Sequence, residues 1–219
     1  MEQSVKEKTQ RCLSLRRRTR VSRLQKRRRY LIAKRCMDVA GAVIFLLLLW
    51  PVMLLIALLI RLDSLGPVIY RQERLGLYGR PFIMYKFRTM CPDAEPDGPC
   101  WASVTDCRCT RAGRFLRRTH LDELPQLWNV LRGEMSLVGP RPERKFFYLQ
   151  FQQQIPEFPR RLSVKPGLTG LAQINGGYDL SPEEKIRYDM EYIHEQSLVL
   201  DLFCLIKTVR LLFTQEGAR

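Results

Sequence analysis

The longest apolar segment of the chain runs from Val39 to Ile60, about 22 residues without a charge. A helix of this length is long enough to span a hydrocarbon core of ~30 Å. Asp38 and Arg61 bound the segment. Pro51 lies near its middle, where the missing N–H and a clash with the preceding turn predict a kink. Two interpretations follow: a helix that crosses a membrane once, or a kinked re-entrant helix that enters and leaves by the same face.

Basic residues flank both ends of this segment. Residues 1–35 hold fourteen Lys/Arg and two acids, so a net +12 of the formal +15 lies there. On the other side follow six basic residues, Arg61, Arg71, Arg74, Arg80, Lys86 and Arg88. Positive charge is retained on the cytoplasmic side of membranes, so both ends are expected in the cytoplasm, which the re-entrant path satisfies. A cleaved signal peptide does not fit, because the run is too long.

The basic tail itself, residues 1–35, has too few apolar residues to bury a core. It is either a solvated extension or a polybasic segment held on anionic lipid. Its position directly before the apolar run favours the lipid. Nucleic-acid binding is not expected, because no recognition helix or base-stacking aromatic pattern accompanies the charge. The predicted organisation is a basic tail (1–35), a membrane anchor (36–66) and a cytoplasmic domain (67–219).

Alternating apolar and polar positions predict a short β-hairpin after the anchor. Residues 68–70 and 81–88 read as its strands, separated by a polar stretch that contains glycine. A period of two places Lys86 and Arg88 on the same face of the second strand. They form either a clamp for a phosphate group or a solvated basic face on an edge strand.

Residues 91–110 lack periodic apolar positions and contain three prolines, which predicts a loop. Asp93, Glu95 and Asp97 lie within it. Carboxylates on a loop near arginines suit divalent cation binding or covalent chemistry. An ordinary acidic loop without chemistry is the alternative.

The same loop carries four of the seven cysteines, Cys91, Cys100, Cys107 and Cys109. A structural zinc site needs paired cysteines two to four residues apart or histidine partners. The Cys107-Arg108-Cys109 spacing is too tight for that pattern, and an odd cysteine count does not suggest a disulfide framework. Free thiols in a reducing cytosol are expected.

From Arg111 onward the pattern becomes helical. Arginines recur at helical spacing and an apolar stripe follows them: Arg111, Arg114 and Arg118, then Leu121, Leu124, Leu127, Trp128 and Leu131. Thr119 is a candidate N-cap and Gly133 a helix stop. A helix is therefore expected to begin near Thr119 and to end at Gly133.

Two adjacent acids, Asp122 and Glu123, lie near the start of that helix. They suit the positive end of the helix dipole and ion pairs to Arg117 or Arg118. Their adjacency among arginines also makes them candidate catalytic acids. Arg141 differs from these arginines because prolines flank it on both sides, which reduces the entropy lost when its planar fork grips a phosphate.

The C-terminal third contains a glycine-rich region and then helical patterns. Residues 165–170 and 175–177 predict a flexible, amide-rich loop that could cradle an anion. Ser181 begins one or two amphipathic helices that extend to Thr208. Leu198–Phe213 is so apolar that it fits either an in-plane interfacial helix or a buried core helix.

Five ordered motifs between Lys34 and Phe213 resemble the bacterial sugar transferases known as monotopic phosphoglycosyl transferases. They are Gly66-Pro67-Val68 with Arg71-Gln72-Glu73-Arg74, Tyr85-Lys86-Phe87-Arg88-Thr89-Met90, Leu121-Asp122-Glu123-Leu124-Pro125-Gln126, Met135-Ser136-Leu137-Val138-Gly139-Pro140-Arg141-Pro142, and Lys165-Pro166-Gly167-Leu168-Thr169-Gly170. The chain looks like the minimal catalytic form, without the extra N-terminal membrane helices of larger members.

The resemblance implies a fold and a site. The fold is α+β and mostly helical, with a proline-broken re-entrant membrane helix, interfacial amphipathic helices and a small β-hairpin. An adjacent Asp-Glu pair after the Lys-Phe-Arg-x-Met segment carries the family's covalent chemistry. By position Asp93 is the nucleophile and a metal-binding carboxylate. This chain departs from the pattern, because Ala94 follows it and the next acids are Glu95, assigned as the second carboxylate, and Asp97.

The implied reaction moves a sugar phosphate from a nucleoside diphosphate sugar onto a polyprenyl phosphate, with Mg²⁺ as cofactor. Asp93 attacks the sugar-linked phosphate, and the lipid phosphate then attacks the phosphosugar-enzyme, which predicts ping-pong kinetics. A carboxylate needs cations to approach a diphosphate. The phosphate-binding residues are expected to be Arg88, Arg108 and Arg141, with Lys86, Arg111, Arg117 and Arg118 as further candidates. Asp122 and Glu123 then become architectural.

The resemblance also implies where the protein is located and what it binds. The protein is expected in the bacterial inner membrane, with its catalytic domain facing the cytoplasm and anionic lipids around it. An apolar C-terminal segment is compatible with a homodimer. The altered Asp-x-Glu spacing keeps a second function class open, a membrane-tethered, non-catalytic binding or scaffold protein. The sequence identifies neither the sugar, the base nor the polyprenol.

Overall fold

The computed structural model describes residues 2–91, 94–95, 98, 100 and 106–214. The chain divides into two compact units, Met1–Met37 and Asp38–Arg219. Helix α1 (Glu2–Asp63) provides the whole of the first unit that is described and continues into the second. The basic tail is therefore helical, and the second unit contains all other elements.

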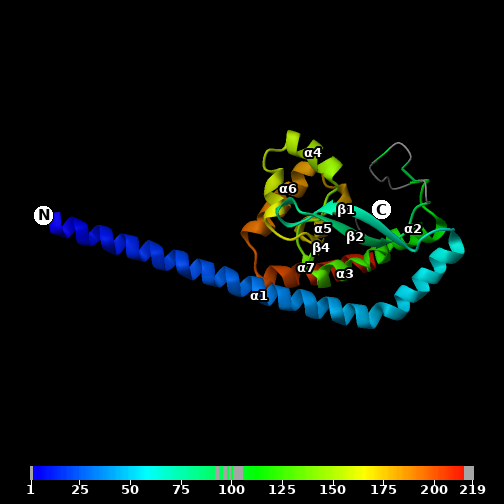
Figure 1. The fold of residues 1–219 in the computed structure, drawn as a ribbon, viewed down its shortest axis with the longest axis horizontal. Coiled ribbons are helices and arrows are strands. Elements are labelled where there is room, and N and C mark those ends of the chain that lie inside the picture. The colour runs from blue at the N-terminus through cyan, green and yellow to red at the C-terminus, as the bar shows by residue number, and fades with distance from the viewer. Residues whose placement is uncertain (1, 92–93, 96–97, 99, 101–105, 215–219) are drawn as a thin grey trace. The chain divides into compact units, whose positions relative to one another are not determined.

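Within the second unit, α1 carries the long apolar run. Arg27–Asp63 of this helix is long and apolar enough to cross a membrane, judged by length and composition. Pro51 lies inside the helix. Figure 1 shows α1 changing direction in the light blue part of the ribbon, in the region where a proline removes one helical hydrogen bond. The predicted kink is thus present.

The predicted β-hairpin is confirmed. Strands β1 (Ile69–Leu75) and β2 (Pro81–Phe87) pair antiparallel across a turn that contains η1 (Leu77–Gly79). Asn129 fastens this hairpin from outside: its Nδ2 donates to the Ile83 carbonyl (2.7 Å) and its Oδ1 accepts from the Tyr85 N–H (3.1 Å). The side chain of Asn129 is fully buried. Losing such a paired buried amide costs about 1–3 kcal/mol of stability.

The helical region after Arg111 is divided differently from the prediction. It comprises α2 (Arg111–Arg118), η2 (Leu121–Glu123) and α3 (Gln126–Arg132). Thr119 is the C-cap of α2 and not an N-cap, because its hydroxyl donates back to the Phe115 carbonyl (2.9 Å). The cap that begins α2 is Thr110, which accepts from the Gly113 N–H. Gly133 ends α3 in the left-handed conformation, as expected.

The glycine-rich region is not a flexible loop at its start. β4 (Gly167–Thr169) pairs parallel with β3 (Ser136–Val138). A Cβ on Gly167 would lie 2.1 Å from the Gly139 nitrogen, so this glycine is required for close backbone approach. The Gly139 N–H donates to the Thr169 carbonyl (2.8 Å). The Gly167 N–H likewise donates to the Pro140 carbonyl (2.9 Å). The flexible loop predicted at 165–170 is therefore wrong over Gly167–Thr169, which form a strand.

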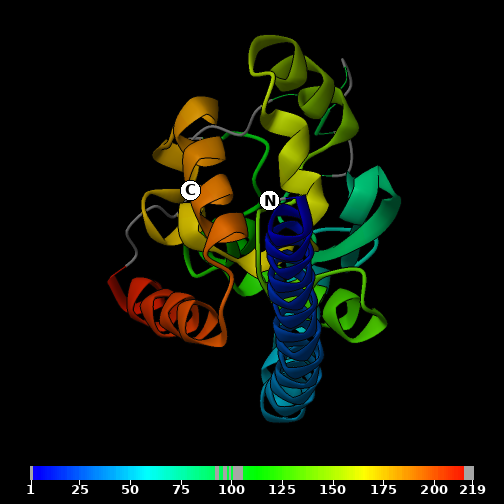
Figure 2. The ribbon, with the colours of Figure 1, turned by 90° about the vertical axis from the view of Figure 1, so that its left-hand side faces the viewer.

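Further helical elements follow in the part of the chain that the structure describes. They are α4 (Lys145–Gln154), η3 (Phe158–Ser163), α5 (Leu171–Ile174), η4 (Gly177–Asp179), α6 (Pro182–His194) and α7 (Leu198–Thr214). Ser181 and Glu184 form a reciprocal capping box at the start of α6, which confirms the predicted start. In Figure 2, α6 and α7 (orange and red) lie opposite the green-blue hairpin.

The core lies between the hairpin, β3 and the C-terminal helices. Its buried side chains include Phe82, Met84, Leu137, Tyr192 and Cys204. On α7, Cys204 and Asp201 face this core, whereas the opposite side exposes a row of large apolar side chains: Leu198, Val199, Leu202, Phe203, Ile206 and Val209. The helix thus packs one face on the protein and leaves an apolar face uncovered.

Candidate active site

A pocket of about 1070 Å³ lies in the second unit between the hairpin, η2, the segment after β3 and the helices α1, α5 and α7. One part of its wall is apolar and includes Phe45, Leu49, Leu205 and Val209. The other part is strongly basic and is lined by Arg74, Lys86, Arg88, Arg108, Arg117, Arg141, Arg144, Arg161 and Lys185. Such a wall suits a ligand with a polyanionic head and an apolar portion.

Glu123 organises the middle of this wall. Its Oε1 accepts a hydrogen bond from Lys86 Nζ (2.8 Å). Its two carboxylate oxygens also accept hydrogen bonds from the two terminal nitrogens of Arg141. Burial alone would raise the pKa of Glu123, but Arg141 and Lys86 outweigh it and hold that pKa well below its usual range. Glu123 is therefore ionised and holds two cations side by side.

Asp122 behaves in the opposite way although it is the adjacent residue. Burial raises the pKa of Asp122 from 3.8 to about 6, against the opposing charge of Lys86. Lys86 Nζ lies 3.8 Å from its carboxylate but is bound more closely by Glu123. The acid pair thus binds Lys86 and Arg141, rather than Arg117 or Arg118 as the sequence suggested. The predicted partners were therefore wrong, and the architectural role of the two acids stays a prediction.

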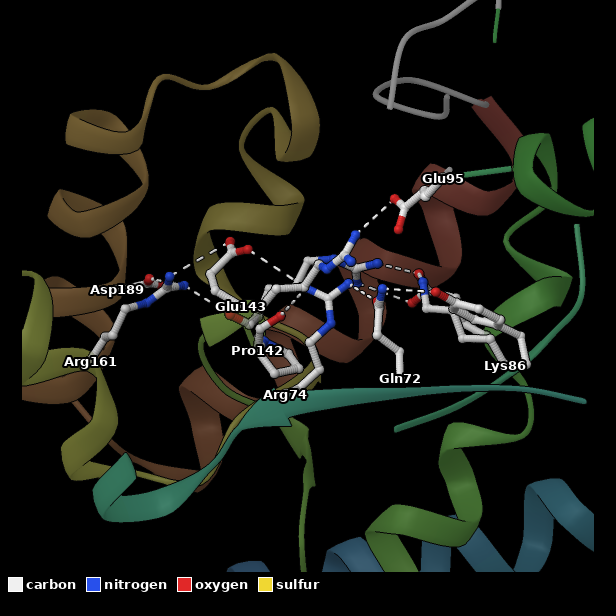
Figure 3. Close-up of polar contacts among 12 residues, drawn as sticks. Gln72, Arg74, Lys86, Glu95, Pro142, Glu143, Arg161 and Asp189 are labelled. Atoms are coloured by element: carbon white, nitrogen blue, oxygen red, sulfur yellow. Dashed lines mark hydrogen bonds and ion pairs between the residues drawn. The ribbon is translucent and has the colours of Figure 1, made fainter. Parts of the chain in front are cut away.

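Glu95 lies at a second group of cations. Its Oε1 is 2.8 Å from Arg144 Nη1 and 4.0 Å from Arg108 Nη1, and Figure 3 shows Glu95 at the end of this set of contacts. Arg108 in turn donates its Nε to Asp106 (2.7 Å). The hydrogen bond from Arg108 lowers the pKa of Asp106 to about 2, although burial opposes it. Asp93 and Asp97 lie outside the described residues.

Arg88 has donors that its own chain does not use. Its Nη2 donates to the carbonyl (2.7 Å) and to Oγ (2.8 Å) of Ser64. Its Nε and Nη1 are buried and have no hydrogen-bond partner among the described residues. Buried donors without a partner are rare and cost free energy. Within the basic wall, they fit an anionic ligand.

The other predicted basic residues divide between the pocket and the surface. Lys86, Arg108, Arg117 and Arg141 line the pocket with Arg88. Arg111 lies on the exposed face of α2 and is not among the pocket residues. Ala112 and Leu116 form the buried face of α2, and Arg111 lies on the other face. The structure therefore does not support Arg111 as a phosphate-binding residue.

Several pocket residues were missed by sequence reasoning. Arg144, Arg161, Lys185 and His120 line the pocket but belong to four separate segments. Only Arg144 had a local signal, since it follows Arg141 by three residues in the same proline-containing stretch. His120 has a left-handed backbone (φ 56°), and burial lowers its pKa.

The described donor set gives a simple test of metal binding. Among the described residues, no three His, Cys, Asp or Glu side chains gather closely enough to hold an ion by themselves. Mg²⁺ is commonly bound through one or two carboxylates together with substrate phosphates. Glu95 is a partly exposed pocket carboxylate paired with Arg144. It is a described residue that could hold such an ion together with a phosphate ligand.

The second unit is thus a mostly helical, α+β unit with a basic pocket beside helices α1 and α7, which expose apolar side chains. The chain belongs to the bacterial sugar transferase family, whose model matches residues 29–215. The family resemblance read from the motifs is therefore confirmed.

Named relatives agree with this assignment. Over 193 residues the chain is 45% identical to a UDP-N-acetylgalactosamine-undecaprenyl-phosphate N-acetylgalactosaminephosphotransferase of Aeromonas hydrophila, covering 87% of this chain and 46% of that protein. It is 45% identical over 195 residues to a UDP-glucose:undecaprenyl-phosphate glucose-1-phosphate transferase of Xanthomonas campestris pv. campestris (86% and 40% covered). A transferase of the same name from Caulobacter vibrioides is 45% identical over 193 residues (85% and 72% covered). The chain spans less than half the length of the first two relatives.

Proposed function

We propose that the protein transfers a sugar 1-phosphate from a nucleoside diphosphate sugar to undecaprenyl phosphate, the first membrane step in building a polysaccharide or glycoconjugate. The basic, partly apolar pocket is the observation that carries this proposal, because both substrates have a phosphate head and the acceptor has an apolar tail. The relatives' names support a UDP-linked donor. They differ in the sugar, so the sugar is left open.

The proposed chemistry is a two-step displacement at phosphorus. The Asp93 carboxylate forms a bond to the sugar-linked phosphorus, and the phosphorus–oxygen bond to the nucleoside monophosphate breaks. The lipid phosphate then attacks the same phosphorus and releases Asp93 as a carboxylate. Each step replaces one phosphorus–oxygen bond with another, so atoms and charge balance without an oxidant or reductant.

The pocket's own residues bind and orient the phosphates in this scheme. Arg88 is the first candidate because two of its buried donors have no partner among the described residues. Arg141 and Lys86, held by Glu123, form a second cationic pair. Glu95, two residues after Asp93 in the sequence, binds Arg144 and lies 4.0 Å from Arg108. Such fixed cations stabilise charge on a transferring phosphoryl group.

Mg²⁺ is part of the proposal as a cofactor, with Asp93 and Glu95 as the residues that would hold it. When bound, it would neutralise the diphosphate and stabilise the departing nucleoside monophosphate.

The anchor is proposed to be re-entrant, which would keep the catalytic unit on the cytoplasmic face of the inner membrane. Both ends of the apolar run make hydrogen bonds to this same unit. Asp38 accepts from Ser136 Oγ and from the Leu137 N–H (both 2.9 Å), and Asp63 accepts from the Ala112 N–H (3.1 Å). A single crossing would separate the two ends by a core of ~30 Å. The uncovered apolar face of α7 would lie in the same interface.

Substituting Asp93 tests the catalytic proposal. In detergent with Mg²⁺ and a panel of UDP-sugars, Asp93→Asn should reduce release of uridine monophosphate by ~10³-fold or more. Glu157→Gln is a matched control, because Glu157 is an exposed surface acid paired with Arg160. Near-normal turnover of Asp93→Asn would remove the covalent role. A wild-type protein that binds these substrates but releases no monophosphate would instead support a non-catalytic scaffold.

A further inference from the structure

The segment that carries Arg141 is held in an unusual way. Two of its residues, at 140 and 142, are prolines and have no N–H to donate. Its four consecutive carbonyls, those of residues 140–143, all accept a hydrogen bond. In the same order the donors are the Gly167 N–H (2.9 Å), Arg161 Nη2 (2.9 Å), Arg74 Nη1 (3.2 Å) and the Leu75 N–H (3.1 Å). Two of these donors are guanidinium groups from distant parts of the chain.

The two guanidinium donors belong to one ionic network behind the segment. Arg161 Nη2 lies 2.8 Å from Asp189 Oδ2, and these side chains are only 5% and 2% exposed. Glu143 lies between the cations, 3.7 Å from Arg161 and 3.8 Å from Arg74. Figure 3 shows Arg161 pointing toward both Asp189 and Glu143, with Arg74 at the other end of the Glu143 carboxylate.

The side chains of Arg141 and of the adjacent Arg144 bind two other acids, both of which line the pocket. Arg141 contacts Glu123, and Arg144 contacts Glu95 (2.8 Å). The backbone is thus held in a clamp of hydrogen bonds, while the two guanidinium groups make separate contacts. Since proline flanks Arg141 on both sides, little of its own backbone is free to adjust. The clamp thus fixes where the side chain begins, and Glu123 binds the guanidinium at its end.

Stability alone does not account for the Arg161–Asp189 pair. Removing two charges from water often costs as much as their attraction returns, and apolar replacements of buried pairs are frequently neutral or stabilising. Burial raises the pKa of Asp189, which shows that its surroundings disfavour the charge even with Arg161 beside it. The geometry assigns the pair another task, because the Arg161 nitrogen that binds Asp189 also binds the carbonyl of Arg141.

We propose that Arg161, oriented by Asp189, is a positioning residue that fixes the guanidinium of Arg141 for binding a diphosphate. The inference rests on the proposed function only in taking a nucleoside diphosphate as the ligand of Arg141. Arg161 also lines the pocket, but its side chain is only 5% exposed and donates to the Arg141 carbonyl, so in this proposal it acts through the backbone of Arg141.

A double-mutant cycle tests this coupling. Binding of uridine diphosphate is measured by calorimetry, and turnover of UDP-sugars in parallel, for the full-length wild type, Arg141→Gln, Arg161→Gln and the double variant. Arg161→Gln alone should lower kcat/KM by about 10- to 100-fold, the scale of a misplaced binding group, and should weaken binding of uridine diphosphate. In the Arg141→Gln background the same change should have almost no further effect.

Arg160→Gln is the matched control. Arg160 is adjacent in sequence, but its side chain is exposed and pairs with the surface acid Glu157 (2.6 Å), so this variant should behave as wild type. If Arg161→Gln does not fold, Arg161→Lys serves instead, because a lysine keeps the charge beside Asp189 but lacks the two-armed fork. That variant should fold and bind uridine diphosphate more weakly than the wild type. In the Arg141→Gln background, Arg161→Lys should have almost no further effect on binding.

The outcomes separate clearly. Additive losses would show that Arg161 acts independently of Arg141 and would overturn the inference, as would unchanged diphosphate binding in Arg141→Gln. Wild-type protein that binds uridine diphosphate with the expected non-additive cycle but never forms a lipid product would instead refute the proposed function and leave the positioning role supported.

Discussion

Glu123 and Asp122 are neighbours along the chain, yet their pKa values move in opposite directions. The pKa of Glu123 falls well below its usual range because Arg141 and Lys86 outweigh its burial. The pKa of Asp122 rises to about 6 because burial dominates there and Glu123 binds Lys86 more closely. One carboxylate thus supplies a fixed charge, and its neighbour is poised to accept a proton.

Asp122 should therefore make stability depend on pH. Its folded-state pKa of about 6 lies above the ordinary value of 3.8, so the folded protein binds the proton more tightly. The resulting stabilisation is fully present below pH 3.8 and is lost as pH rises through about 6. Asp122→Asn removes this titration. Relative to wild type, the variant should gain thermal stability between pH 4.5 and 7.5, whereas a difference that does not change with pH would contradict the shifted pKa.

Sequence reasoning predicted site residues best where the signal was local. Arg141 was found from its flanking prolines, and Lys86 with Arg88 from strand alternation. Arg161 and Asp189 gave no such signal, because their roles arise only when η3 and α6 bring them against the segment at 140–143. Long-range ion pairs leave no periodic trace in a sequence.

At the scale of elements, capping and alternation predicted the hairpin, the start of α6 and the end of α3. The capping pattern gave a wrong prediction at Thr119, which is the C-cap of α2 although threonine is more common at the N-cap of a helix. The reason is the interruption by η2, which separates α2 from α3 and gives His120 a left-handed backbone. The prediction was also wrong at Gly167, where close packing of β3 against β4, rather than flexibility, requires glycine.

The attachment of α1 makes a second prediction at this scale. Asp38 is 2% exposed and accepts two hydrogen bonds, one from Ser136 and one from the backbone of Leu137. Asp38→Ala leaves both donors buried without this acceptor, so it should destabilise the second unit by about 2–4 kcal/mol. Thermal unfolding in detergent measures this loss. Glu183→Ala, at an exposed position of α6, is the control, and equal melting temperatures for the two variants would exclude the anchoring role.

At the scale of the whole molecule, the proposed re-entrant anchor would place both flanks of the apolar run on one side of the membrane. Cys36 before the run and Cys107 after it are both exposed thiols and serve as natural probes. Single-cysteine variants that retain one or the other should both resist an impermeant maleimide in intact cells. Both should react in inverted membrane vesicles. Labelling of only one of them in intact cells would indicate a single crossing.

The bulk charge and the apolar run predicted a basic protein at a membrane, and the motifs predicted its family. The composition of the pocket could not be predicted in the same way. Its wall combines residues from α1, the hairpin, η2 and the segment after β3, and only folding brings them together. The homodimer and the lipid-bound tail stay predictions.

The proposed reaction requires a covalent phosphosugar on Asp93, and this species can be trapped. The wild-type protein is mixed with a labelled UDP-sugar and Mg²⁺, without undecaprenyl phosphate, quenched, and analysed by intact mass and peptide mapping. The account predicts one added sugar phosphate on the peptide that contains Asp93, which disappears when undecaprenyl phosphate is supplied. Monophosphate release that requires the lipid and leaves no adduct, or a label on another residue, would contradict it.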